Sequence, residues 1–244
     1  MNRGVIDDED KTAAIIVAGG AGTRMEGTTP KQFRMLGGVP VLMRTIAVFE
    51  RSLSIDNIII VVPEAERDGL FRGDRARYRP AKPGDVRAGG ATRRDSVAAG
   101  LEALDDSIGI VAVHDGARPL VTVAVIDRCV EEARRCGAAV VGVPVTDTLK
   151  VIDANRNIID TADRESLWHV QTPQVFRRDI IVKAYERALR DGRYGTDDAT
   201  LVERIGVPVT MVDGSRDNIK ITYEEDILIA EALLAARSGT VKEN

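Results

Sequence analysis

Residues 13–25 read AAIIVAGGAGTRM, and residues 30–32 read PKQ. The apolar half of this stretch predicts a buried strand, and the glycines after it predict a tight loop at the carboxyl end of that strand. Glycine lets backbone N–H groups approach a ligand closely, and such donors suit phosphate oxygens. Arg24 and Lys31 add positive charge in the same segment. The stretch is typical of an α/β fold and indicates a polyphosphate site.

Two common phosphate loops do not match this segment. A Walker A loop ends in Gly-Lys-Ser or Gly-Lys-Thr, whereas residues 22–24 read GTR. The dinucleotide fingerprint requires Gly or Ala where Met25 stands. A glycine-rich strand-to-helix turn with surface cations and no ligand stays open as an alternative at this point.

Composition bounds the class of protein. The chain has 244 residues and a formal net charge of −4, which argues against a general nucleic-acid coat. It contains no apolar run of about 18 residues and no secretory pattern, so we expect a cytoplasmic protein without membrane contact. Two cysteines and two histidines cannot form a thiolate or imidazole cage, so any metal should be a hard ion such as Mg²⁺.

Strands and helices alternate through the first part of the chain. The expected strands are continuous apolar runs, which are typical of a parallel sheet covered on both faces. They are Thr12–Ala18, Asn57–Val62, Ile110–Val113 and Ala138–Val143. The expected helices between them are Val41–Glu50, Ser96–Leu104 and Val123–Arg135. This order predicts a Rossmann-like three-layer α/β/α sandwich with a mostly parallel sheet, whose ligand loops lie at the carboxyl ends of the strands.

The alternation breaks at about residues 145–172, where two short strands around a turn predict a projecting β-hairpin arm. An isolated two-stranded arm is marginal in water, so we expect it to pack on a second subunit. Further expected elements are helices at Arg178–Arg190, Asp197–Ile205 and Tyr223–Ala236, strands at Val207–Val212 and Asn218–Thr222, and a long loop at Arg75–Gly90. Thr222 and Glu225 are spaced as a capping box for the last helix. We expect a flexible leader at 1–11, one domain at 12–237 and a flexible tail at 238–244.

Charged residues follow two of these strands. Asp115 and Arg118 lie directly after an apolar run and suit a metal ion and a phosphate. Asp217 and Lys220 supply a second carboxylate and another cation farther along. With the glycine loop, Arg24 and Lys31, they form a set suited to transfer at phosphorus, in which the protein supplies donors and charge. No protein nucleophile is needed if the second substrate is itself a phosphate.

Six motifs in order resemble the 2-C-methyl-D-erythritol 4-phosphate cytidylyltransferase family, within the sugar and polyol cytidylyltransferases. They are residues 18–25 with 30–32, His114–Pro119, Leu167–His169, Gln171–Gln174, Thr196–Asp198 and Asp217–Lys220. The resemblance runs from about Thr12 to Arg237. It implies that CTP and the polyol phosphate react to give a CDP-linked polyol and pyrophosphate, in the non-mevalonate isoprenoid pathway.

The resemblance also implies roles for particular residues. Arg24, Lys31 and Lys220 would be catalytic, with Arg24 and Lys31 stabilising the transition state at the α-phosphorus. CTP would contact Ala18, Gly19, Gly20, Ala21, Gly22, Thr23, Gly89, Gly90, Ser96, Gly116 and Ala117. The polyol phosphate would contact Thr148, Arg164, Thr172, Thr196, Asp115 and Arg118. Asp115 and Asp217 would hold Mg²⁺. The arm would make a homodimer, in which Thr148 and Arg164 act across the interface.

Two alternatives remain from the sequence. A ribitol 5-phosphate cytidylyltransferase needs the same CTP apparatus and differs in its polyol pocket. A regulatory nucleotide-binding module would bind CTP without releasing pyrophosphate, although the set of Arg24, Lys31, Asp115 and Lys220 argues against it.

Overall fold

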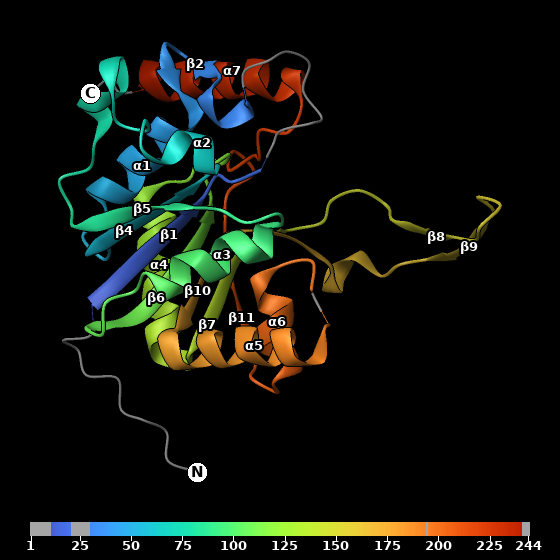
Figure 1. Cartoon of the computed structure of the whole chain (residues 1–244). Helices are drawn as coiled ribbons and strands as arrows, with labels where there is room; N and C mark the ends of the chain where they lie inside the picture. Colours follow the sequence, from blue (N-terminus) through green and yellow to red (C-terminus); the bar gives the residue numbers. More distant parts are fainter. Residues whose placement is uncertain (1–10, 21–29, 194, 241–244) are drawn as a thin grey trace.

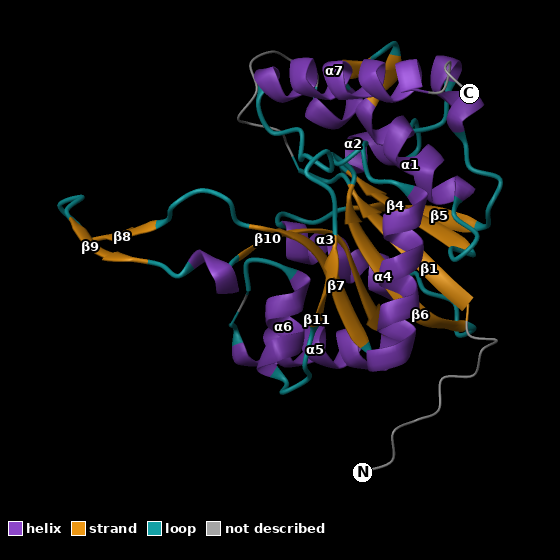
Figure 2. Ribbon diagram, turned by 180° about the vertical axis from the view of Figure 1, so that it is seen from behind, coloured by secondary structure: helices purple, strands orange, loops and turns teal. Residues whose placement is uncertain are grey.

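The computed structural model describes residues 11–20, 30–193 and 195–240. Its central element is a seven-stranded sheet in the order β11-β7-β10-β6-β1-β4-β5 (Figures 1 and 2). The strands are β1 (Lys11–Val17), β4 (Asn57–Val62), β5 (Gly84–Ala88), β6 (Ile108–Asp115), β7 (Ala138–Pro144), β10 (Trp168–Arg177) and β11 (Thr210–Asp213). Strand β10 runs antiparallel to β6 and β7, and the other neighbouring pairs are parallel.

Helices cover both faces of this sheet, as the figures show. They are α1 (Val41–Arg51), α2 (Glu64–Arg67), α3 (Arg93–Glu102), α4 (Val123–Cys136), α5 (Arg178–Asp191), α6 (Asp198–Arg204) and α7 (Glu224–Thr240). The described residues also form the short 3₁₀ helices η1 (Lys31–Phe33), η2 (Gly73–Tyr78) and η3 (Arg164–Ser166). The predicted three-layer α/β/α fold is confirmed.

Successive residues of a strand point to opposite faces, and β1 shows why both faces are apolar. Ala14 and Ile16 belong to the core formed with α1 and α4. Ala13 and Ile15 belong to the core on the other face, with α3, α5 and α6. A continuous apolar run is therefore what a strand buried on both faces requires.

A smaller third core lies beneath α7. Leu36, Ile221 and Ala230 are buried there, where α7 packs against the hairpin of β2 (Met35–Leu36) and β3 (Val39–Pro40). The amino end of α7 is capped by Asp226, whose Oδ2 accepts from the backbone N–H groups of Thr222 and Tyr223 at 2.7 and 2.8 Å. The prediction of Glu225 as the capping residue was therefore wrong, because the capping carboxylate belongs to the next residue, Asp226.

The arm projects from the main body in both views (Figures 1 and 2). Its strands β8 (Lys150–Ile152) and β9 (Ile158–Thr161) form a two-stranded antiparallel sheet. Ile158 and Ile159 are 64% and 63% exposed. The predicted hairpin is confirmed, and it carries apolar side chains that its own chain leaves uncovered.

Several expected boundaries differ from the structure. The expected loop at Arg75–Gly90 contains η2 and the edge strand β5, whose mixed polar sequence gave no apolar run. The expected strand at Asn218–Thr222 is not a strand. Strand β10 was not predicted, because polar residues at positions 171, 172 and 174 interrupt it. Lys11 belongs to β1 rather than to a leader, and α7 continues to Thr240, three residues past the expected end of the domain.

None of the helices in the described ranges combines the length and the apolar composition that crossing a bilayer requires.

Candidate active site

The glycine loop after β1 lies at the same sheet edge as the segment after β6. The N–H of Gly116 donates to the carbonyl of Val17 at 2.8 Å, and the N–H of Ala18 donates to the carbonyl of Val61 at 2.7 Å. The N–H of Gly89 donates to the carbonyl of Val62 at 2.7 Å. These bonds bring the predicted nucleotide-binding segments together at the carboxyl ends of four adjacent strands, β6, β1, β4 and β5.

Two glycines of this edge pack closely against the side chain of Ser96. A Cβ at Gly19 would lie 2.8 Å from Ser96 Oγ, and one at Gly89 would lie 2.7 Å from the same atom. Ser96 is itself buried, and its hydroxyl donates to the carbonyl of Thr92 at 3.1 Å. Gly19, Gly89 and Ser96 are therefore neighbours, as a shared nucleotide pocket requires. Ala21, Gly22, Thr23 and Arg24 lie outside the described residues.

Gln32 holds the described end of the glycine loop. Its Nε2 donates to the carbonyl of Ala18 at 2.9 Å and to the carbonyl of Gly20 at 3.3 Å. The side chain is almost fully buried, so these bonds replace water at the loop backbone. Lys31 is the neighbouring residue in η1, and its backbone is thereby fixed beside the loop. We did not predict a role for Gln32, although its place after Lys31 was visible.

Asp115 is the centre of a charge cluster at the end of β6. Its Oδ1 lies 3.1 Å from Arg93 Nε, and its Oδ2 lies 2.9 Å from Lys220 Nζ and 3.5 Å from Arg118 Nε. We call these four residues the Asp115 cluster. Burial alone would raise the pKa of Asp115, but the surrounding cations hold it well below its ordinary value. Asp115 is therefore a carboxylate at neutral pH.

Arg93 belongs to a second ion pair that was not predicted. Its Nη2 lies 2.9 Å from Asp198 Oδ2, and Asp198 Oδ1 accepts from the hydroxyl of Tyr185 at 2.6 Å. Burial by itself lowers the pKa of Arg93, but Asp198 and Asp115 more than offset this and raise it. Local sequence carried no signal for these contacts, since Arg93 and Asp198 are 105 residues apart.

His114 is fully buried beside the cluster, with the ring of Phe49 4.8 Å away. Its Nε2 lies 3.2 Å from the carbonyl of Arg118, and its Nδ1 lies 3.0 Å from Thr172 Oγ1. A carbonyl can only accept, so Nε2 carries the proton and Nδ1 accepts from the Thr172 hydroxyl. The same Thr172 oxygen accepts from the N–H of Asp115 at 3.1 Å. Neutral His114 and Thr172 therefore fix the backbone that carries Asp115.

This arrangement predicts a pH effect on stability. Burial lowers the pKa of His114 from 6.5 to about 3. Between these values the unfolded chain binds the proton and the folded chain does not, so stability rises with pH. Lowering the pH from 7.5 to 5.5 should therefore reduce the free energy of unfolding by about 1.4 kcal/mol through this residue.

Urea unfolding of the protein and of His114→Asn at both pH values checks this expectation. The variant should lack that part of the pH dependence, whatever its stability at pH 7.5. An equal pH dependence in both proteins would show that His114 is not responsible.

A cleft of about 440 Å³ opens beside the Asp115 cluster. All four cluster residues line it, together with Thr172 and Thr196. Arg118 Nε is buried there without a hydrogen-bond partner in the described part of the chain, while its Nη1 donates to the carbonyl of Asn218 at 2.7 Å. The structure thus brings together the predicted residues Asp115, Arg118, Thr172, Thr196 and Lys220.

Other predicted residues lie elsewhere. Thr148 and Arg164 belong to the arm, and Arg164 Nη1 donates to the carbonyl of Thr146 at 2.9 Å rather than lining the cleft of its own chain. Asp217 forms an ion pair with Arg237 of α7 at 3.1 Å. Within the described ranges, no three carboxylate, imidazole or thiol groups are placed to hold a metal ion.

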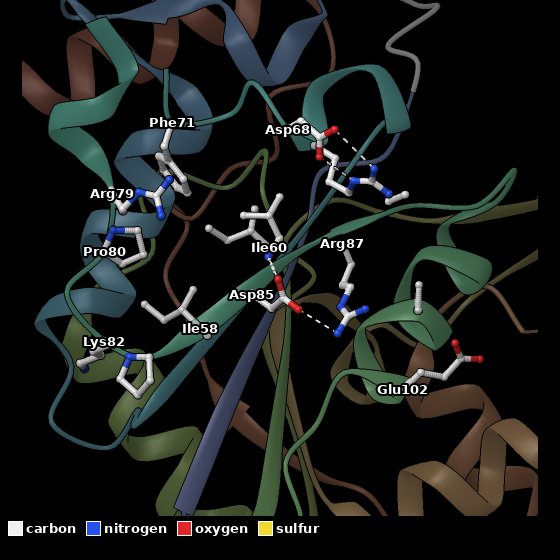
Figure 3. A pocket seen from close by; sticks show the side chains of 16 residues that line it. Ile58, Ile60, Asp68, Phe71, Arg79, Pro80, Lys82, Asp85, Arg87 and Glu102 are labelled. Carbon is white, nitrogen blue, oxygen red and sulfur yellow. Dashed lines mark hydrogen bonds and ion pairs between the residues drawn. The ribbon is translucent and has the colours of Figure 1, made fainter. Parts of the chain in front are cut away.

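A larger cavity of about 840 Å³ opens along the edge strand β5 (Figure 3). Two of its arginines have carboxylate partners: Arg67 pairs with Asp68, and Arg87 pairs with Asp85. Lys82 Nζ donates to the carbonyls of Phe49 and Ser52. Each of these two arginines has a carboxylate of its own, whereas Arg118 and Lys220 share the single carboxylate of Asp115 with Arg93. The cleft at the Asp115 cluster is therefore the better candidate for a phosphate substrate.

A family model described as 2-C-methyl-D-erythritol 4-phosphate cytidylyltransferase (IspD) matches residues 12–236. The chain belongs to this family. It is 42% identical over 231 residues to the 2-C-methyl-D-erythritol 4-phosphate cytidylyltransferase of Syntrophus aciditrophicus, covering 95% of this chain and 99% of that protein. It is 48% identical over 225 residues to that of Geobacillus kaustophilus, covering 92% and 97%.

A solved structure agrees with this assignment. The crystal structure of 4-diphosphocytidyl-2C-methyl-D-erythritol synthase from Anaerococcus prevotii matches with a TM-score of 0.81 and 30% identity, covering 93% of this chain and 97% of that one. Family membership confirms the predicted resemblance and the assignment as a nucleotidyltransferase. It also favours methylerythritol phosphate over ribitol phosphate as the substrate of cytidylyl transfer.

Proposed function

We propose that this chain transfers the cytidylyl group of CTP to 2-C-methyl-D-erythritol 4-phosphate, and that the Asp115 cluster receives the polyol phosphate. The observation that carries this proposal is the meeting of Lys220, Arg118 and Arg93 around one buried carboxylate, beside the glycine loop. Three cations and the carboxylates of Asp115 and Asp198 give this ion-pair group a formal charge of +1, and Asp197 and Glu203 also line the cleft. Lys220 and Arg118 are the groups that would donate to a phosphate here.

The proposed chemistry needs no protein nucleophile. An oxygen of the polyol phosphate attacks the α-phosphorus of CTP and forms the new P–O bond. The bond from that phosphorus to the β-phosphate oxygen breaks, and pyrophosphate leaves with the electron pair. Lys31 and Arg24 would stabilise the charge on the α-phosphate oxygens, and Lys220 would hold the attacking phosphate.

We also propose that Mg²⁺ is the divalent cation, because hard ions suit carboxylate and phosphate oxygens. Both oxygens of Asp115 already face cations, so this carboxylate can contribute at most one oxygen to a metal ion. The described residues therefore fit an ion whose other ligands are substrate phosphates and water. Such an ion would neutralise phosphate charge when bound. A role for Asp217 in holding the ion stays a prediction, since this side chain pairs with Arg237. A cytoplasmic location is likewise our prediction.

A pyrophosphate-release assay with CTP and Mg²⁺ tests the function. We expect turnover with methylerythritol phosphate and a much lower kcat/KM with ribitol 5-phosphate. Preference for ribitol 5-phosphate would overturn the choice of substrate. Binding of CTP without pyrophosphate release with either polyol phosphate would favour a regulatory module instead.

We further propose that the arm completes the cleft of a second copy. The exposed isoleucines of β9 support a partner, because an isolated hairpin with uncovered apolar side chains is poorly stable. The position of Arg164 on the arm, away from the cleft of its own chain, supports a role across the interface.

Mixing two inactive variants, Arg164→Ala and Lys31→Ala, tests this arrangement. In a mixed dimer, one site would combine Lys31 of one chain with Arg164 of the other. Random exchange should then restore about one quarter of the activity, because half the dimers are mixed and each has one intact site of two. No recovery after demonstrated subunit exchange, or full activity of a monomer in sedimentation, would rule the arrangement out.

A further inference from the structure

The guanidinium of Arg93 contacts two different carboxylates through two of its nitrogens. Nε reaches Asp115 Oδ1, and Nη2 reaches Asp198 Oδ2, at 3.1 and 2.9 Å. The guanidinium also lines the cleft, where 30% of the side chain is exposed. Arginine suits this place because its planar fork presents donors in fixed directions, whereas lysine offers a single point of charge.

Asp198 supports Arg93 from the protein interior. Its side chain is 1% exposed, and it accepts the Tyr185 hydroxyl from α5. Its backbone N–H donates to Gln174 Oε1 of β10 at 3.1 Å. Two separate elements therefore hold Asp198 in place, and the position of the guanidinium follows from the position of Asp198.

The position of Arg93 determines how Asp115 meets the other cations. With Oδ1 occupied by Arg93, Oδ2 is the oxygen that faces Lys220 and Arg118. The terminal torsion of a carboxylate is broad, so without Arg93 both oxygens could turn to Lys220 and Arg118. Those two cations would then be held more tightly by the protein and would be less able to turn toward a bound phosphate.

We propose that Arg93, held by Asp198 and Tyr185, is a positioning residue for the polyol-phosphate end of the site. It compensates the negative charge of the Asp115 carboxylate while Lys220 and Arg118 bind the substrate phosphate. This inference rests on the proposed function of the cleft. It assigns Arg93 to one substrate, because Arg93 shares Asp115 with Lys220 and Arg118, which the proposed function places at the polyol phosphate.

Steady-state kinetics of four variants test the proposal, with thermal unfolding measured for each. Arg93→Gln should raise KM for methylerythritol phosphate at least tenfold and change KM for CTP less than twofold. Arg93→Lys should recover only part of the loss, because an ammonium group cannot bridge both carboxylates. Tyr185→Phe, which removes only a hydroxyl, should raise the same KM about two- to threefold.

Arg134→Gln is the matched control. Arg134 donates to Thr12 Oγ1 at 2.9 Å at the amino end of β1, the opposite end of the strand from the cleft. Both Michaelis constants should be unchanged in this variant.

Two results would overturn the proposal: an unchanged KM for methylerythritol phosphate in Arg93→Gln, or an equal rise in both Michaelis constants. If Arg93→Gln does not fold, Tyr185→Phe decides by the same comparison. An inactive parent protein would instead overturn the proposed function, so the two failures are distinguishable.

Discussion

Asp115→Asn is expected to reduce turnover by about 10²- to 10³-fold, the scale of losing a preorganised electrostatic contact in an active site. The carboxylate is the common partner of Arg93, Arg118 and Lys220. The amide keeps the shape but removes the charge, so the three cations would repel one another. Lys220 and Arg118 would no longer be held in directions suited to the substrate phosphate.

The same change should also destabilise the fold, by about 3–5 kcal/mol, because it removes one partner of a buried ion pair. Pyrophosphate release and urea unfolding measure the two effects. Asp74→Asn is a suitable control, because Asp74 is an exposed acid of η2. Near-normal turnover in Asp115→Asn would remove Asp115 from the site we propose.

Lys31→Ala is the second large effect that we expect. Turnover should fall about 10²- to 10³-fold, because the ammonium would stabilise charge that develops at the α-phosphate during transfer. The affinity for CTP should fall only a few-fold, since an interaction made mainly in the transition state lowers kcat more than binding. Gln32 should keep the glycine loop in place through its bonds to Ala18 and Gly20.

Stopped-flow turnover and calorimetric titration of CTP separate these two quantities. Lys183→Ala is the matched control, since Lys183 is an exposed lysine of α5. A large loss of CTP affinity with normal turnover at saturating CTP would assign Lys31 to ground-state binding instead.

The parts of the fold that local sequence predicted are those buried on both faces. Asn57–Val62 was predicted with the bounds that the structure has, because isoleucine and valine, which fill β4 after Asn57, favour a covered parallel strand. Strand β10 was missed, because Gln171, Thr172 and Gln174 interrupt its apolar pattern. Each of these side chains is buried and hydrogen-bonded to another part of the site region.

The glycine loop, Asp115 and Lys220 were predicted as site residues, because strand ends and charged residue types are visible locally. The ion pair of Arg93 with Asp198, a residue of the quoted motif Thr196–Asp198, was missed for a different reason. An ion pair depends on the distance between charged atoms in space, and no periodicity marks partners that are 22 or 105 residues apart.

The amino-acid sequence by itself determined the layered α/β fold, the glycine loop at the end of the first strand and the family. These depend on residue types and their order within short segments. Only the tertiary structure decided which cations share Asp115, that Asp198 and Tyr185 support Arg93, and that Arg164 lies away from the cleft of its own chain. Those features arise from the packing of distant segments, where distance and burial set the strength of each charge interaction.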